Sequence, residues 1–155
     1  MNAGQALQLL DFRVLPRHTG TWEGDWLFLD AEGHETLRYR AVLTQRIEDN
    51  RWLQTNQNYL SDGRTTTQNF VGQAIGPGRV RVESTEPPFS NYQMVAEEHG
   101  ESLLLFEIKD QAIGQLLALE TINLLDDARR VRSTQSFAED GQLRGFLLIR
   151  ETRIK

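Results

Sequence analysis

The sequence predicts an all-β fold, a single antiparallel up-and-down barrel of roughly eight to ten strands preceded by a short N-terminal helix. Two patterns predict it. After Pro16, apolar and polar residues alternate with period two, as in strands that turn one face toward a core. Clusters rich in Gly, Asn and Asp interrupt the alternation at intervals of roughly ten residues, which is typical of antiparallel sheets. Because a meander of that many strands exposes hydrogen-bonding edges unless it closes, we expect a barrel.

The first expected element is an amphipathic helix over residues 1–15. This stretch has no turn former before Pro16 and contains the apolar residues Ala6, Leu7, Leu9, Leu10, Phe12, Val14 and Leu15. We expect the helix to lie across one end of the barrel, which residues 18–154 form. The chain has 155 residues, enough for one domain and too few for two well-packed ones, so 1–155 is interpreted as one domain.

The strands follow in order between the turns. They are expected at 21–30, 35–47, 51–60, 64–74, 79–85, 89–97, 102–109, 115–124, 129–138 and 142–153. The turns between them contain Gly, Asn or Asp, which tolerate the positive φ of tight hairpins. Strand 35–47 alternates most clearly, whereas strand 142–153 has Leu147 beside Leu148, which predicts a strand covered on both faces.

Composition excludes several classes of function. Seventeen basic and 22 acidic residues give a net charge of -5, which disfavours nucleic acid and anionic lipid surfaces as partners. The chain has no cysteine, so disulfides, thiolate catalysis and cysteine-based zinc or iron–sulfur sites are excluded. The clean apolar runs 103–106 and 146–149 are too short for a membrane span or signal peptide, so a cytoplasmic protein is expected.

Strand 51–60 is unusual because it carries carboxamides on both faces. If Trp52 faces inward, Gln54, Asn56 and Asn58 do so too. Unpaired buried amides cost roughly 1–3 kcal/mol, so these side chains need partners. Two interpretations stay open: the row contacts a ligand, or it bonds to neighbouring strands and trapped water. Strand 64–74 is also polar, which fits either a continuation of this row or a solvent-facing edge.

Glu120 and Arg132 are the candidate catalytic residues. Glu120 interrupts an otherwise apolar strand, and Arg132 lies in the next strand. A lone carboxylate inside a barrel has a raised pKa and can act as a general acid or base, whereas a neighbouring Arg keeps it charged. The alternative is a cross-strand pair on an exposed face, without a function.

No metal or nucleophile site is predicted. His18, His34 and His99 lie in Gly-containing turns or beside a strand start, where a solvated imidazole is expected. The sequence contains no His-x-x-x-His or Glu-x-x-His pair and no Gly-x-Ser-x-Gly elbow. We therefore expect no metal and no cofactor.

Gly20-Thr21-Trp22, at the start of the first strand, resembles the Gly-x-Trp signature of lipocalins and related calycins. The resemblance implies that the indole plugs the closed end and that an Arg of the last strand stacks on it; Arg150 and Arg153 are the candidates, and Trp22 and Arg150 are assigned to structure.

With the stretches 20–24, 54–59 and 148–153, residues 18–154 resemble an uncharacterised bacterial lipocalin-like family, a domain of unknown function related to fatty-acid-binding proteins and phycobilin lyases. Related heme-binding barrels place their axial His in the late strands. No residue after His99 is a histidine, so heme is disfavoured.

We expect the barrel to bind one apolar or amphipathic small molecule. The candidate ligand-binding residues combine aromatic walls with inward carboxamides: Trp26, Tyr39, Gln54, Asn56, Phe70 and Phe106. One alternative is a cofactor-free cyclase or isomerase that folds a flexible apolar substrate, as allene oxide cyclases and pericyclase barrels do, with Glu120 stabilising developing charge. Others are a bilin-handling protein and an interaction protein with a filled barrel. An exposed edge near 79–97 would allow a homodimer.

Overall fold

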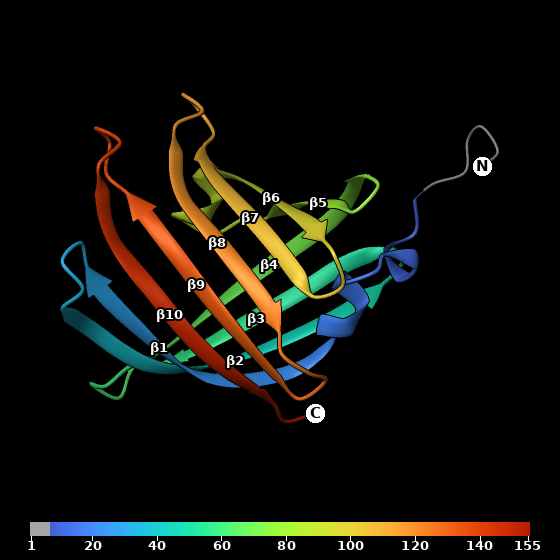
Figure 1. Cartoon of the computed structure of the whole chain (residues 1–155), viewed down its shortest axis with the longest axis horizontal. Helices are drawn as coiled ribbons and strands as arrows, with labels where there is room; N and C mark the ends of the chain where they lie inside the picture. The colour runs from blue at the N-terminus through green and yellow to red at the C-terminus, as the bar shows by residue number, and fades with distance from the viewer. Residues whose placement is uncertain (1–6) are drawn as a thin grey trace.

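The computed structural model describes residues 7–155, and in this part of the chain ten antiparallel strands form a closed barrel (Figure 1). The strands are β1 (Gly20–Asp30), β2 (Glu35–Glu48), β3 (Arg51–Tyr59), β4 (Thr65–Gly76), β5 (Arg79–Glu83), β6 (Tyr92–His99), β7 (Leu103–Asp110), β8 (Leu116–Leu124), β9 (Arg129–Phe137) and β10 (Leu143–Arg153). Each strand pairs with its neighbours in sequence, and β1 closes the barrel against β10. The predicted all-β up-and-down barrel is confirmed, at the upper end of the expected number of strands.

The segment before β1 forms two 3-10 turns rather than one continuous helix. They are η1 (Leu9–Asp11) and η2 (Leu15–His18); residues 1–6 of the expected helix 1–15 lie outside the described residues. A third such turn, η3 (Phe89–Asn91), precedes β6. We attribute the short turns to side chains of the barrel that bind the backbone N–H groups a longer helix would use internally.

Two barrel side chains make these contacts at one end of the barrel, which we call the closed end. Asn50, in the β2–β3 turn, accepts a hydrogen bond from the backbone N–H of Leu9 at 2.8 Å. The Glu98 carboxylate of β6 accepts the backbone N–H groups of Arg13, Val14 and Leu15 at 3.1, 2.5 and 2.6 Å. The N-terminal segment therefore covers this end, as predicted, although without an α-helix in residues 7–18.

Glycines allow the sharp curvature at the β1–β10 closure. A Cβ on Gly24 would lie 2.3 Å from the backbone oxygen of Arg150, and one on Gly145 would lie 2.3 Å from that of Leu29. Gly20 has a φ of +133°, and a Cβ there would lie 2.5 Å from Nη1 of Arg153. The Gly of the Gly-x-Trp signature thus makes room for an Arg of the last strand.

Two expectations about the sheet are wrong. Leu148 is 41% exposed, so β10 is covered only on its inner face, because the N-terminal segment packs on the end of the barrel and not on its side. The segment 79–97 is not an exposed edge, since β5 lies between β4 and β6 and pairs with both. The homodimer proposed through that edge therefore loses its structural basis.

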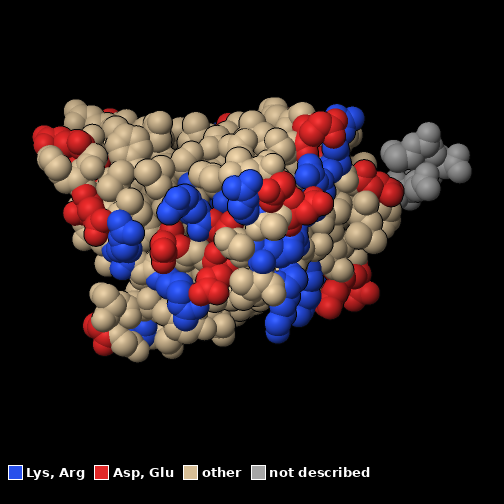
Figure 2. All heavy atoms as spheres, turned by 60° about the horizontal axis from the view of Figure 1, so that its bottom comes forward, with Lys and Arg blue, Asp and Glu red and all other residues tan. Residues whose placement is uncertain are grey.

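The outer face over β1 and β2 carries interleaved charges (Figure 2). Arg40 pairs with Glu23 at 2.7 Å, and Arg38 pairs with Glu35 at 2.9 Å. Opposite charges lie side by side on this face and do not segregate into a basic patch. None of the helical turns in residues 7–155 has the length and apolar character needed to cross a membrane.

Candidate ligand-binding cavity

The interior of the barrel contains a cavity of about 270 Å³. A single water molecule needs only about 10–15 Å³ on a comparable measure, so side chains leave the barrel substantially hollow. All eight candidate site residues line this one cavity: Trp26, Tyr39, Gln54, Asn56, Phe70, Phe106, Glu120 and Arg132. The structure therefore brings together every side chain selected from the sequence.

An apolar wall covers the side of the cavity formed by β4 to β8. Its lining side chains are Phe70, Val80, Val82, Met94, Ala96, Leu104, Phe106, Ile108 and Ile122, with Phe89 from η3. Phe70 and Phe89 meet edge to face with ring centroids 5.1 Å apart. A surface of this kind favours an apolar ligand through burial alone and gives it little orientation.

A stack of aromatic rings forms a second wall on β1 and β2. Tyr39 lies between Trp26 and Phe28, with ring centroids 5.6 and 5.4 Å away. The guanidinium of Arg132 lies 5.3 Å from the Trp26 ring and extends the stack as a cation–π contact. Burial raises the pKa of the Tyr39 hydroxyl to about 12, so it stays protonated at neutral pH.

The carboxamides of β3 face inward, as predicted, and form a directed chain of hydrogen bonds. Gln45 Nε2 and Trp52 Nε1 both donate to Gln54 Oε1, at 2.9 and 3.1 Å. Gln54 Nε2 in turn donates to Asn56 Oδ1 at 2.9 Å. Both interpretations drawn from the sequence hold in part, because the amides pair with one another and also line the cavity.

Glu120 and Arg132, which we call the wall pair, form a forked ion pair in the cavity wall. Arg132 Nη2 lies 3.2 and 3.0 Å from the two Glu120 oxygens, and Thr134 donates its hydroxyl to Glu120 Oε2 at 3.0 Å. The two side chains are 10% and 8% exposed, so the exposed-pair alternative is wrong. Burial opposes the charge on Arg132, but Glu120 and Glu151 outweigh it and raise the pKa of the guanidinium.

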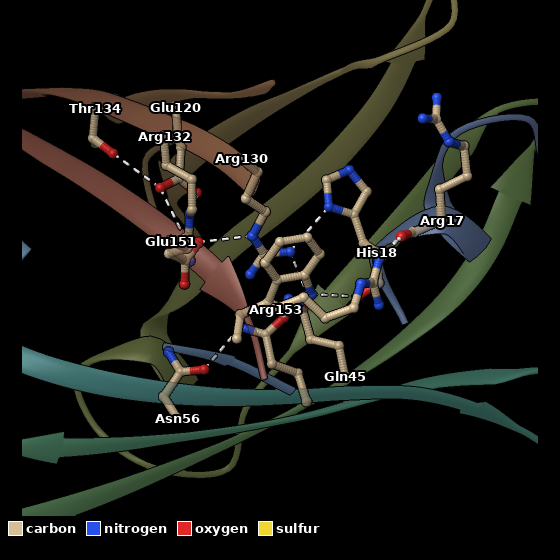
Figure 3. Close-up of polar contacts among 12 residues, drawn as sticks. Arg17, His18, Gln45, Asn56, Glu120, Arg130, Arg132, Thr134, Glu151 and Arg153 are labelled. Carbon is tan, nitrogen blue, oxygen red and sulfur yellow. Dashed lines mark hydrogen bonds and ion pairs between the residues drawn. The ribbon is translucent and has the colours of Figure 1, made fainter. Parts of the chain in front are cut away.

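A second ion pair lies deeper, toward the closed end, and we call His18, Gln45, Arg130 and Glu151 the floor cluster. Arg130 Nε donates to Glu151 Oε1 at 2.7 Å, directly across β9 and β10, and both side chains are 0% exposed. Arg130 Nη1 donates to Gln45 Oε1 at 2.7 Å and to His18 Nδ1 at 2.9 Å. Figure 3 shows this cluster beside the wall pair, which Arg132 Nη1 links to Glu151 at 3.6 Å.

The charges of the floor cluster are set by burial and by each other. Burial lowers the pKa of Arg130 to about 10 although Glu151 opposes the change. Burial also works against the charge of Glu151, but Arg132 and Arg130 hold the pKa of this carboxyl below its ordinary value. Both groups are therefore charged at neutral pH and balance each other.

His18 contradicts the expectation of a solvated imidazole, because it is only 1% exposed. Burial, followed by the charge of Arg130, lowers the pKa of His18 to about 2, so the ring is neutral. Since Arg130 donates to Nδ1, the proton of the neutral ring lies on Nε2. The sequence signal failed because Pro16 and the following turn fold back under the barrel.

Trp22 plugs the closed end below the floor cluster, as the resemblance implies. The Arg153 guanidinium lies 4.4 Å from the Trp22 ring and that of Arg130 lies 4.3 Å from it, so two cations contact one indole. Arg150, assigned to this role from the sequence, is exposed on the outer face. The strand alternation places Arg153 beside the ring because the chain leaves the regular β10 pattern at its last residues.

Sequence reasoning missed Arg130, Glu151 and Gln45. A usable signal existed for Arg130, since it lies two residues before Arg132 and shares its strand face. Gln45 likewise shares the face of Leu43, at a position where the apolar pattern of 35–47 is interrupted. For Glu151 the local pattern offered nothing, because its neighbours Arg150 and Thr152 are also polar.

A smaller hollow opens beside the cavity, between β5 and β6. Val82, Phe89 and Met94 line both spaces and so form the partition between them. No group of three or more metal-ligating side chains occurs among residues 7–155.

Comparisons with known proteins identify a family and a fold. The model of a family described as "Domain of unknown function (DUF3598), N-terminal" matches residues 11–155. No curated protein matches the chain. Among solved structures, a DUF3598-family protein of unknown function from Nostoc punctiforme PCC 73102 is 19% identical, with a TM-score of 0.65 over 98% of this chain and 53% of that one. This chain thus spans about half the length of the Nostoc protein.

Two further structures share the barrel. Rv2717c from M. tuberculosis is 16% identical, with a TM-score of 0.67 over 91% of this chain and 95% of that one. The S-type phycobiliprotein lyase CPES from Guillardia theta is 10% identical, with a TM-score of 0.66 over 90% and 89%. At these identities the similarity establishes the fold alone, and it agrees with the predicted resemblance to a lipocalin-like family related to phycobilin lyases.

Proposed function

We propose that this chain, which belongs to the DUF3598 family, binds one small amphipathic molecule inside its barrel. The observation that supports the proposal is the cavity of about 270 Å³, with apolar and aromatic walls on one part and a few oriented polar groups on the other. Sites for small molecules have this composition, because apolar contact supplies affinity and placed hydrogen-bonding groups fix the orientation.

The two kinds of wall give the ligand a polarity. Apolar side chains of β4 to β8 cover one side, whereas Gln54, Asn56 and the wall pair reach the cavity from β3, β8 and β9. In Figure 3, Asn56 rises from β3 while Glu120 and Arg132 hang from the opposite strands of that view. A ligand with an apolar body and a hydrogen-bonding edge fits this arrangement.

Filling the cavity tests the proposal. Ala96 lines the apolar wall and is 2% exposed, so Ala96→Phe places a ring in the space meant for the ligand. The probe is propionyl-dimethylaminonaphthalene, an uncharged fluorescent ketone, titrated against the wild type and the variant. We expect saturable binding of one molecule to the wild type and a loss of affinity of roughly tenfold or more in the variant.

The matched control is Ala128→Phe. Ala128 is exposed in the β8–β9 turn at the closed end, so the same change there should leave probe binding unaltered. Circular dichroism of both variants checks that the barrel persists. Equal binding by Ala96→Phe and the wild type, with the fold intact, would place the probe on the surface and contradict the proposal.

Bilin handling is a second candidate, favoured by the likeness to the phycobiliprotein lyase from Guillardia theta. Titration with biliverdin, followed by visible absorption and circular dichroism, tests it. The cyclase or isomerase alternative stays a prediction. Glu120 already accepts hydrogen bonds from Arg132 and Thr134, which favours a fixed carboxylate over a general base.

A further inference from the structure

The charged groups of the cavity wall already neutralise one another. Two guanidinium groups line the cavity, those of Arg130 and Arg132. Glu151 pairs with Arg130 at 2.7 Å and with Arg132 at 3.6 Å, while Glu120 pairs with Arg132 at 3.0 Å. His18 is the remaining basic side chain in the lining, and its buried ring is neutral. The wall therefore offers two positive and two negative charges.

This balance disfavours an anionic ligand. A carboxylate or sulfonate entering the cavity loses its hydration and finds no unneutralised cation to replace it. The nearest guanidinium, Arg132, already binds both oxygens of Glu120 through Nη2. Its Nε and Nη1 atoms have no hydrogen-bond partner among the described residues, but they are fully buried and so lie out of reach of a molecule in the cavity.

The amide chain supplies the complementary requirement. It runs from Arg130 through Gln45 and Gln54 to Asn56, and each member donates to the next at 2.7 to 2.9 Å. Asn56 Nδ2, the last donor, makes no hydrogen bond to any residue in 7–155, and Asn56 lines the cavity. Hydrogen bonds in series polarise one another, so this terminal N–H is a strengthened donor. It calls for an acceptor oxygen on the ligand.

We infer that the cavity selects an uncharged ligand that presents an acceptor oxygen, such as a carbonyl, to Asn56, and rejects the corresponding anion. The inference rests on the proposed function and narrows its ligand class. Glu120 is the residue that enforces the selection, since it cancels the charge of the cation nearest the ligand. Removing its charge gives the wall a net positive charge and should admit the anion.

Two probes with one ring system test the selection. The first is the uncharged propionyl-dimethylaminonaphthalene, whose emission shifts to the red when its carbonyl accepts a hydrogen bond; the second is dimethylaminonaphthoate, its carboxylate counterpart. We expect the wild type to bind the ketone at least about tenfold more tightly than the carboxylate, and Glu120→Gln to reduce this ratio by about tenfold or more, mainly through tighter binding of the carboxylate.

Two further variants keep the test decisive. Glu107→Gln, an exposed Glu on the outer face of β7, is the matched control and should leave the ratio unchanged. Arg132→Gln makes the wall more negative and should raise the ratio, which gives a readout of opposite sign if Glu120→Gln does not fold. Binding of both probes with ratios that none of the variants changes would overturn the inference alone. Failure of both probes to bind the wild type would overturn the proposed function as well.

Discussion

The floor cluster and the wall pair are built from the same chemistry, an Arg of β9 paired with a Glu of a neighbouring strand, yet they differ in what surrounds them. Arg130 and Glu151 are 0% exposed, lie over Trp22 and touch protein on every side. Arg132 and Glu120 are 8% and 10% exposed, and their exposed surface faces the cavity. The comparison separates a buried ion pair that holds the closed end together from one that is available to a ligand.

The difference follows from position along β9. Arg130 comes first after the β8–β9 turn at the closed end, where the N-terminal segment and Trp22 fill the barrel. Arg132 is two residues farther along the same face, level with the start of the hollow. One step of the strand alternation thus changes an ion pair from structural support to a cavity wall.

The largest effect should come from neutralising the floor cluster. Glu151→Gln leaves two buried guanidinium groups with less compensation and should reduce the free energy of unfolding by about 3–5 kcal/mol. Glu120→Gln should reduce it by only about 1–2 kcal/mol, because water in the cavity can solvate Arg132. Urea unfolding of the ligand-free variants measures both.

A surface pair completes this series. Glu23 pairs with Arg40 on the outer face at 2.7 Å, with side chains 37% and 45% exposed. Glu23→Gln should therefore change the free energy of unfolding by less than about 1 kcal/mol. If Glu120→Gln proved as destabilising as Glu151→Gln, the two regions would not differ as described.

The second effect is a pH dependence that belongs to the floor cluster alone. The pKa of His18 is about 2 in the folded protein and 6.5 as a free side chain, so between these values the unfolded chain binds the extra proton. Stability should therefore fall as the pH drops below 6.5, by roughly 2 kcal/mol at pH 5. The lowered pKa of Glu151 adds a loss of the same sign at more acidic pH.

His18→Gln should flatten this dependence between pH 6.5 and 5. A Gln oxygen can still accept the hydrogen bond from Arg130 and takes up no proton in this range. Urea unfolding at several pH values compares it with His34→Gln, whose ring is 72% exposed and should contribute little. A wild type with constant stability from pH 7.5 to 5 would show that His18 is not held neutral.

The alternation of the sequence predicted the barrel and all ten strands to within a few residues, because period two and turn composition are local properties. It also placed Gln54 and Asn56 inside through their relation to Trp52. What it could not provide was depth. His18 is buried because a turn folds under the barrel, and Arg130 differs from Arg132 only through distant side chains that fill one end. These are tertiary facts without a local pattern.

A smaller effect should distinguish Arg153 from Arg150. Arg153 donates to the backbone oxygens of Thr19, Arg17 and Asp127 and stacks on Trp22, so it ties three segments of the closed end together. Arg153→Ala should lower the free energy of unfolding by about 1–2 kcal/mol, whereas Arg150→Ala should change it by less than about 0.5 kcal/mol. Thermal unfolding measures both, and equal losses would mean that the sequence assignment of Arg150 was right.

The smallest change in stability, with a clear change in binding, is expected for Asn56→Leu. Asn56 accepts one hydrogen bond from Gln54, and Leu at this position adds apolar contact, so the free energy of unfolding should shift by less than about 1 kcal/mol. Affinity for the ketone should fall roughly five- to tenfold, and its emission should move to the blue, because the terminal donor of the amide chain is gone. Gln57→Leu, one residue along on the outer face of β3, is the matched control. If stability collapses while ketone binding survives, the amides belong with the floor cluster as structure, and the boundary between the two regions lies higher in the barrel.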